Sequence, residues 1–163
     1  LTNVDKDGNS WDKNFEKWQF KDEAKTEERG TKSPEFNFWS GYNDYKVKWE
    51  YNQTNNDYQR INGDVSQKDR NDESPIRSRV IVVNFMKESR ANDGYENNLH
   101  LLYGTKGSGK ALIFQDGQVI EGTWNKKDRK SRMTFKDAKG KEIKFNPGQI
   151  WIEILPIGSE VVY

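Results

Sequence analysis

The sequence predicts a mostly β protein, an antiparallel sheet or sandwich of about ten strands with hairpin connections; a β-rich α+β fold is the alternative. Three observations support this prediction. Several short segments alternate between apolar and polar residues, which is the period of a half-buried strand. Clusters of turn-forming residues separate these segments at short intervals. At most one short helix is indicated, near the start of the chain.

The composition favours one folded domain with a core rich in aromatic rings. Hydrophobic residues make up 32% of the 163-residue chain and charged residues 33%, but aromatic residues reach 13% and include six tryptophans. Each buried ring removes a large area from water. The net charge of +1 adds little self-repulsion. Because most aliphatic residues follow residue 79, we expect a conventional β core in the second half, covered by aromatic anchors from the first half.

The first half contains one clear strand pair. Residues 1–35 are polar, and we expect them to form an N-terminal arm or the remnant of a preceding domain, with the β-rich domain over 36–163. Ser10 could cap a short helix through Trp18, although residues 18–20 could equally begin a strand. Residues 45–51 alternate strictly, so their odd-numbered members, Tyr45 to Tyr51, should share a buried face. A polar turn and a partner strand over 57–61 follow, and then a long hydrophilic loop over 63–75.

The second half carries the strongest strand signals. Residues 79–85 are continuously apolar and β-branched, which predicts a central strand covered on both faces. Short strands are expected over 99–103 and 133–136. The sequence Asp137-Ala138-Lys139-Gly140 suits a type I turn with glycine in the left-handed position. The sequence Asn146-Pro147-Gly148 suits a type II turn, which would bring Phe145 near Ile150 and Ile143 near Ile152.

The turn at Asp116-Gly117 fixes a strand register. An Asp-Gly pair is a strong signal for a two-residue hairpin loop, because both central residues must take positive φ angles. The loop pairs Ile113 with Ile120 and places Gly109 opposite Trp124. Residues 107–124 are therefore expected to form one hairpin.

Several motifs fail as catalytic or cofactor sites. Residues 104–110 match the first seven positions of a phosphate-binding loop, but Ala111 replaces the serine or threonine that binds magnesium, and a strand follows where a helix is needed. The chain has one histidine, His100, and no cysteine, which excludes a thiolate or histidine-rich metal site. It has no apolar run long enough to span a membrane. We expect no cofactor and no metal.

Candidate ligand-binding residues lie on predicted strands and in the polar loops between them. Exposed Trp and Tyr faces stack on carbohydrate or peptide ligands, although in a chain short of aliphatic residues these rings can instead fill the core. Carboxylates are plentiful and could serve glycan hydrolysis, with Arg60 or Tyr58 assisting. No spacing selects a catalytic pair. The candidate ligand contacts are Tyr58, Arg60, Asp69 and Trp124.

A basic segment forms a candidate anion patch. Its cationic residues are Lys126, Lys127, Arg129, Lys130 and Arg132. Such a patch could bind lipid headgroups, a polyanionic cell-wall polymer or nucleic acid. It could equally be a solvated connection whose charges stop an exposed strand edge from pairing with other chains. The balanced charge of the whole chain argues against a general nucleic-acid binder.

The segment over 107–156 resembles the C-terminal domain of the YerB-type bacterial lipoproteins, a family of unknown function. The likeness extends over most of residues 36–156. The residues that carry it are Gly109-Lys110-Ala111, Phe114-Gln115-Asp116-Gly117, Glu121-Gly122-Thr123-Trp124, Asp137 with Gly140-Lys141-Glu142-Ile143, Asn146-Pro147-Gly148-Gln149 and Trp151-Ile152-Glu153, with Tyr58, Arg60, Gly63, Asp69 and Val80–Val83 upstream.

The resemblance implies an extracytoplasmic protein. Such a protein would be secreted and anchored by a lipid-modified cysteine on the outer face of the cell membrane in Gram-positive bacteria, and it would have a further N-terminal domain. No catalytic residues follow from the likeness. We therefore expect a non-catalytic, envelope-associated domain with a binding or assembly role, whose partner is a cell-wall polymer or an envelope protein. The alternative is a hydrolase that uses carboxylates on cell-wall glycan or peptide.

Overall fold

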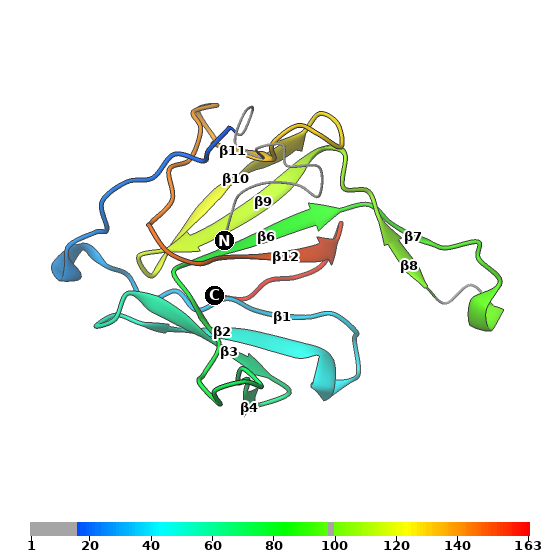
Figure 1. The fold of residues 1–163 in the computed structure, drawn as a ribbon, viewed down its shortest axis with the longest axis horizontal. Coiled ribbons are helices and arrows are strands. Elements are labelled where there is room, and N and C mark those ends of the chain that lie inside the picture. Colours follow the sequence, from blue (N-terminus) through cyan, green and yellow to red (C-terminus); the bar gives the residue numbers. More distant parts are fainter. Residues whose placement is uncertain (1–15, 98–99) are drawn as a thin grey trace, which may run out of the picture.

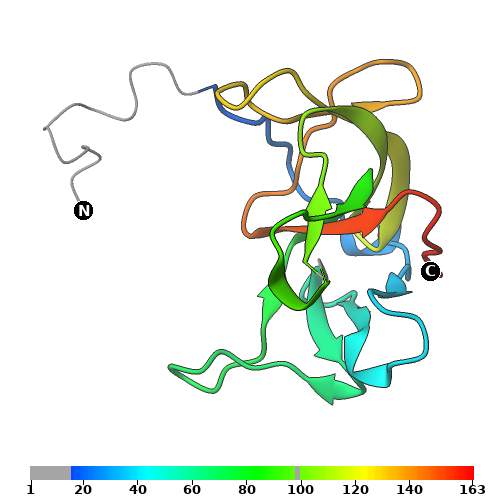
Figure 2. The same ribbon diagram turned by 90° about the vertical axis from the view of Figure 1, so that its right-hand side faces the viewer.

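The computed structural model of the chain describes residues 16–97 and 100–163. Twelve strands and three short 3-10 turns form the regular structure of this part of the chain. Two five-stranded sheets lie in separate layers, and a two-stranded arm extends beyond one of them (Figures 1 and 2). The prediction of a mostly β fold is confirmed.

The first sheet is built from residues 35–78. Its strands are β1 (Glu35–Asn37), β2 (Lys46–Asn52), β3 (Asp57–Asn62), β4 (Val65–Ser66) and β5 (Arg77–Ser78). The predicted hairpin of β2 and β3 is confirmed, and Val47 and Trp49 are fully buried. The prediction for Tyr45 is wrong, because this residue ends a 3-10 turn (Asn43–Tyr45) before β2 and its side chain is 45% exposed.

The second sheet is built from residues 80–156 and has the order β11-β10-β9-β6-β12. Its strands are β6 (Val80–Met86), β9 (Gly107–Gln115), β10 (Gln118–Lys126), β11 (Thr134–Asp137) and β12 (Ile150–Pro156), and the arm adds β7 (Glu88–Arg90) and β8 (Leu101–Tyr103). Every residue of β6 is buried, as predicted for a central strand.

Two predicted turns form as their residues require. Asp116 and Gly117 have φ angles of 54° and 63°, and the strands pair Ile113 with Ile120 and Gly109 with Trp124. Gly140 has a φ of 78°, and its N–H donates to the carbonyl of Asp137. Local turn chemistry therefore determines the register at both positions.

The segments on either side of Asn146-Pro147-Gly148 do not pair with each other, so the predicted pairing of Phe145 with Ile150 and of Ile143 with Ile152 is wrong, although Phe145 and Ile150 pack in the same core. Strand β12 pairs with β6 in parallel, whereas Phe145 pairs through its backbone with Gln19 and Lys21. The physical reason is that Asn146 is completely buried against the other turn, where its Nδ2 donates to Asp116 Oδ1 (2.7 Å). Its backbone N–H is held by the side chain of Gln115, so the segments on either side of this turn diverge.

The N-terminal segment runs along the second sheet. Phe20 forms an isolated bridge with Phe145, which fits the predicted start of a strand at residues 18–20, and the predicted helix cap at Ser10 lies outside the described residues. Further on, Gly30 and Lys32 donate backbone hydrogen bonds to the Asp116-Gly117 turn. The division of the chain at residue 35 stays a prediction.

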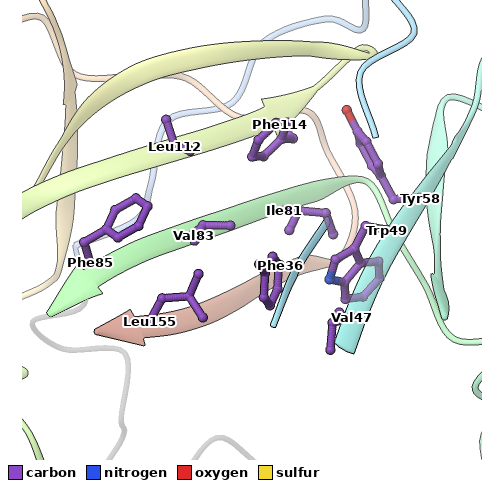
Figure 3. Close-up of a cluster of buried hydrophobic side chains, with 10 residues drawn as sticks. All are labelled: Phe36, Val47, Trp49, Tyr58, Ile81, Val83, Phe85, Leu112, Phe114 and Leu155. Atoms are coloured by element: carbon purple, nitrogen blue, oxygen red, sulfur yellow. The ribbon is translucent and has the colours of Figure 1, made fainter. Parts of the chain in front are cut away.

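The second sheet has a hydrophobic core on each of its faces. The core between the two sheets is shown in Figure 3, where rings from the first sheet point toward side chains from β6, β9 and β12. This core comprises Phe36, Val47, Trp49, Tyr58, Ile81, Val83, Phe85, Leu112, Phe114 and Leu155. The second core lies on the opposite face, around Trp124, Phe135 and Phe145. The predicted covering of an aliphatic sheet by aromatic anchors is thus confirmed.

Candidate functional site

Three aromatic side chains cluster at the surface in the connection between β1 and β2. Trp39 and Tyr42 are each 57% exposed, and Tyr45 is 45% exposed. The ring centroid of Trp39 lies 5.4 Å from that of Tyr42 and 5.4 Å from that of Tyr45. We call Trp39, Tyr42 and Tyr45 the aromatic cluster. Large apolar rings grouped at a surface are typical of an interaction site.

Local hydrogen bonds hold the aromatic cluster in place. The side-chain oxygen of Asn37 accepts a hydrogen bond from the N–H of Trp39 (2.8 Å), and Gly41 supplies the left-handed backbone (φ 86°) that the turn needs. The N–H of Phe38 donates to the carbonyl of Tyr45, which closes the connection. The rings are therefore ordered before any ligand arrives, which lowers the entropic cost of binding.

A groove of about 560 Å³ lies beside the aromatic cluster. It is lined by Glu35, Phe36, Asn37, Phe38, Ser40, Lys46, Ser159, Glu160 and Val162. Phe38 and Ser40 flank Trp39 in the chain and Lys46 follows Tyr45, so the connection that carries the cluster also lines this groove. We call the groove together with the aromatic cluster the aromatic groove.

The groove also offers hydrogen-bonding groups. Lys46 pairs with Glu35 (Nζ to Oε1, 2.9 Å), and this hydrogen bond and the charge of Glu35 raise the pKa of Lys46. The carbonyl of Pro34 accepts a hydrogen bond from Trp49 of β2, and the N–H of Phe38 donates to Tyr45 just before β2. Because peptide groups alternate in direction along a strand, the main-chain groups of Glu35 and Asn37 point away from β2. Val162 pairs with Glu35, whereas the main-chain groups of Asn37 have no partner among the described residues. They are free to bind a polar ligand.

The structure does not bring the four predicted ligand contacts together. Tyr58 is completely buried between the sheets, where its hydroxyl accepts a hydrogen bond from the N–H of Gly117 and burial raises the pKa of Tyr58. Trp124 is buried in the second core, and its Nε1 donates to the carbonyl of Phe85 (3.0 Å). Neither ring is available for stacking on a large ligand.

Arg60 is buried as half of an internal ion pair. Its Nε lies 3.5 Å from Glu153 Oε1, and the same carboxylate oxygen accepts a hydrogen bond from Trp49 Nε1 (3.0 Å). The guanidinium lies 5.8 Å from the ring centroid of Trp49 and 5.5 Å from that of Trp151. It also donates to the side chains of Gln67 and Asn62. This arrangement ties the two sheets together.

Asp69 shapes the loop between β4 and β5. Its carboxylate accepts a hydrogen bond from the N–H of Asn71 (2.8 Å), and its own N–H donates to the carbonyl of Ser74. The side chain is exposed and lies in a different part of the fold from the aromatic groove. Its observed contacts are those of a turn residue.

The candidate anion patch is partly neutralised by internal contacts. Arg132 pairs with Glu142 and with Glu16, and Lys126 donates to the carbonyl of Ser131. The remaining cations, Lys127, Arg129 and Lys130, are exposed. Asp128 lies among them and accepts hydrogen bonds from two backbone N–H groups of the same loop. Of the five cations in the predicted patch, three are therefore exposed and available to an anionic ligand.

The described part of the chain holds no catalytic or metal-binding cluster that we can identify. No group of three His, Cys, Asp or Glu side chains there could hold a metal ion. His100 is exposed, stacks on Tyr95 and contacts Asp93. Residues 107–115 form β9, so the glycine-rich segment does not open a helix. No described helix has the length and apolar character needed to cross a membrane.

The aromatic cluster was not predicted from the sequence. The alternating pattern assigned Tyr45 to a buried face, and Trp39 and Tyr42 were expected among the rings that fill the core. One available signal was Gly41 with Asn43-Asp44, because turn residues inside an aromatic stretch prevent all of its rings from sharing one buried face.

Comparisons with known proteins agree with the architecture. A family model described as "Protein of unknown function (DUF3048) C-terminal domain" matches residues 35–152. The chain also resembles the crystal structure of YerB protein from Bacillus subtilis, with a TM-score of 0.70 and 22% sequence identity. That match covers 90% of this chain and 47% of the YerB chain, so this sequence spans about half the length of that protein. No curated protein matches the chain.

Proposed function

Since this chain belongs to the family of DUF3048 C-terminal domains, whose function is unknown, we propose that it is a non-catalytic binding module of the cell envelope. The aromatic groove would hold a cell-wall polymer. The observation that carries this proposal is the exposure of Trp39, Tyr42 and Tyr45 on the connection that also lines a groove with free polar groups.

The location of this module is part of the proposal. The likeness to YerB-type lipoproteins supports a place outside the cytoplasmic membrane, with a lipid anchor on the outer face of a Gram-positive cell. The 163 residues contain no cysteine, so a lipid-modified cysteine would have to belong to another part of a longer protein. No nucleic-acid partner is proposed, since the net charge is only +1.

A glycan polymer fits the chemistry of the aromatic groove. Aromatic faces offer apolar area to the C–H faces of sugar rings at a low entropic cost, because the aromatic side chains are already packed together. Sugar hydroxyl and acetamido groups need donors and acceptors, which the main chain of Asn37 and the side chains of Lys46 and Glu160 can supply. The groove is also open, which suits a long chain better than a small molecule.

The test is cosedimentation of the protein with purified peptidoglycan. We expect the wild-type protein to be retained, and Trp39→Ala combined with Tyr42→Ala to weaken retention about tenfold, roughly 1.4 kcal/mol. Tyr95→Ala is the matched control, because Tyr95 is 54% exposed but lies on the two-stranded arm. Absence of wild-type retention, or equal losses in both variants, would contradict the proposal.

A second candidate function is hydrolysis of the bound polymer. Glu35 and Glu160 line the same groove, which is the observation in its favour. Against it, Glu35 is paired with Lys46 and Glu160 is exposed, whereas a general acid needs surroundings that keep its proton near neutral pH. Arg60 and Tyr58 are buried and cannot assist. Release of soluble wall fragments by the wild type, lost in Glu160→Gln, would establish the hydrolase.

A further inference from the structure

The outer edge of β12 is the longest sheet edge without a partner in the described part of the chain. β12 ends the second sheet, and its seven residues pair only with β6. The other sheet edges are covered or short. The edge of β1 forms backbone hydrogen bonds with Val162, the edge of β11 forms them with residues 141–143, and β4 has only two residues. A long uncovered edge is a template for another strand.

The ladder between β12 and β6 determines which peptide groups face outward. The carbonyl of Gln149 accepts a hydrogen bond from the N–H of Val80, and the N–H of Ile157 donates to the carbonyl of Met86. Peptide groups alternate in direction along a strand, so the odd-numbered residues between them also face β6. Ile150, Ile152 and Ile154 therefore present their N–H and C=O groups outward.

The outward groups of these three isoleucines are unpaired in the described structure. No hydrogen bond from another described residue reaches the N–H or C=O of Ile150, Ile152 or Ile154. Pro156 ends the free edge, because it has no N–H and its carbonyl accepts from the N–H of Ser159. An extended backbone is the chemical partner that satisfies alternating donors and acceptors at this spacing.

The side chains of this edge carry little of the usual protection against pairing. Natural edge strands carry lysine, proline or inward-pointing charges that discourage another strand. Here residues 150–154 contain one charge, Glu153, which is neutralised by Arg60 inside the sandwich. Ile152, in the centre of the edge, is 37% exposed.

We propose that this edge pairs with the same edge of a second copy of the chain. The three outward positions, 150, 152 and 154, are all isoleucine, so their order is the same in either strand direction. Antiparallel pairing about a twofold axis therefore sets Ile152 opposite Ile152 and Ile150 opposite Ile154 of the second copy. The two five-stranded sheets then form one continuous sheet. The net charge of +1 gives little repulsion between copies. Because so short a contact is small for a protein interface, the expected Kd is on the order of 10 to 100 μM.

The first test is sedimentation of the protein over a range of concentrations that spans this Kd. The wild type should change from monomer to dimer, and Ile152→Lys should weaken the dimer at least tenfold by placing two ammonium groups opposite each other. Ile157→Lys is the matched control, since Ile157 is 70% exposed but lies beyond the free edge. A monomer at every concentration, or an unchanged dimer in Ile152→Lys, would overturn the proposal.

Amide hydrogen exchange locates the contact. The N–H groups of Ile150, Ile152 and Ile154 should exchange rapidly in dilute solution and slowly at high concentration, whereas those of Trp151 and Glu153 should be protected throughout by their bonds to β6. A dimer without this concentration-dependent protection would use another face, and slow exchange of the outward groups in the dilute monomer would mean that the edge is already covered. Either result contradicts the proposal. No residue of β12 lines the aromatic groove, so the outcome is independent of the proposed function.

Discussion

Arg60 is a candidate ligand contact by sequence, but in the structure it forms a buried ion pair. Its guanidinium lies beside two tryptophan rings that contact each other, and it pairs with Glu153, with both side chains almost entirely removed from water. Burying two charges is costly, and their attraction compensates only when the geometry is good. Removing one partner leaves the other charge without compensation.

Glu153→Gln should therefore destabilise the protein by about 3 kcal/mol, because it leaves the charge of Arg60 buried while keeping the volume of the side chain. The double variant Arg60→Met with Glu153→Gln should recover more than half of this loss, since no charge is left uncompensated. Urea denaturation of the three proteins measures both effects. Equal destabilisation by the single and double variants would show that the ion pair is not the source.

Gly109 is required by close packing. A Cβ built at this position lies 2.7 Å from Trp124 Nε1 and 2.8 Å from the carbonyl of Phe85, which are the two partners of a buried hydrogen bond. Gly109→Ala should destabilise the fold by roughly 1 to 3 kcal/mol. Gly104→Ala is the control, because its Cβ would make only ordinary contacts of 3.7 Å with Lys87. Thermal denaturation of both variants makes the comparison, and similar losses would contradict this account.

The turn of the hairpin formed by β9 and β10 contacts several segments that are distant in sequence. Asp116 in its turn accepts hydrogen bonds from Asn56 (2.9 Å) and Asn146 (2.7 Å), and pairs with Lys21 (2.6 Å). Burial alone would raise the pKa of Asp116, but the hydrogen bonds from Lys21, Asn56 and Asn146 and the charge of Lys21 outweigh it and hold the pKa below its usual value. This side chain connects the N-terminal segment and both halves of the chain.

The stability contributed by Asp116 should depend on pH. A carboxyl whose pKa is lower in the folded state stabilises the fold fully above its unfolded value of about 3.9, and this contribution is lost as the pH falls through the folded pKa. Asp116→Asn keeps a residue that tolerates positive φ but does not titrate. The stability difference between the wild type and Asp116→Asn should shrink in acid, as thermal denaturation at several pH values would show. If the stability difference between the wild type and Asp116→Asn stayed constant below pH 4, this prediction would be contradicted.

The elements that could be predicted from the sequence are those that local chemistry determines. The register of β9 and β10 follows from Asp116-Gly117, and the strand at β6 follows from its continuous apolar run. The parallel pairing of β12 with β6 could not be predicted, because Asn146-Pro147-Gly148 reads locally as a hairpin turn. Its actual role depends on a contact between Asn146 and Asp116 that is distant in sequence. The burial of Glu153 could likewise not be predicted, because it depends on the ion pair with Arg60, which is distant in sequence.

At the scale of the whole molecule, the two halves of the chain contribute different materials to one core. The second half supplies aliphatic strands and the first half supplies rings such as Phe36 and Trp49 (Figure 3). Composition indicated this division. Composition could not indicate which rings stay exposed, because the counts of six tryptophans and seven tyrosines do not say where each ring lies. The exposed aromatic cluster became visible only with the turn at residues 38–45 in place.

The most direct measurement is a titration of the labelled protein with soluble peptidoglycan fragments, followed by nuclear magnetic resonance. We predict that the indole N–H signal of Trp39 and the amide signal of Asn37 shift in proportion to bound fragment, because both lie at the aromatic groove. The indole signals of Trp49 and Trp124, which are buried, should stay in place. An absence of shifts at Trp39, or shifts confined to the loop over 127–130, would contradict the assignment of the aromatic groove as the binding site.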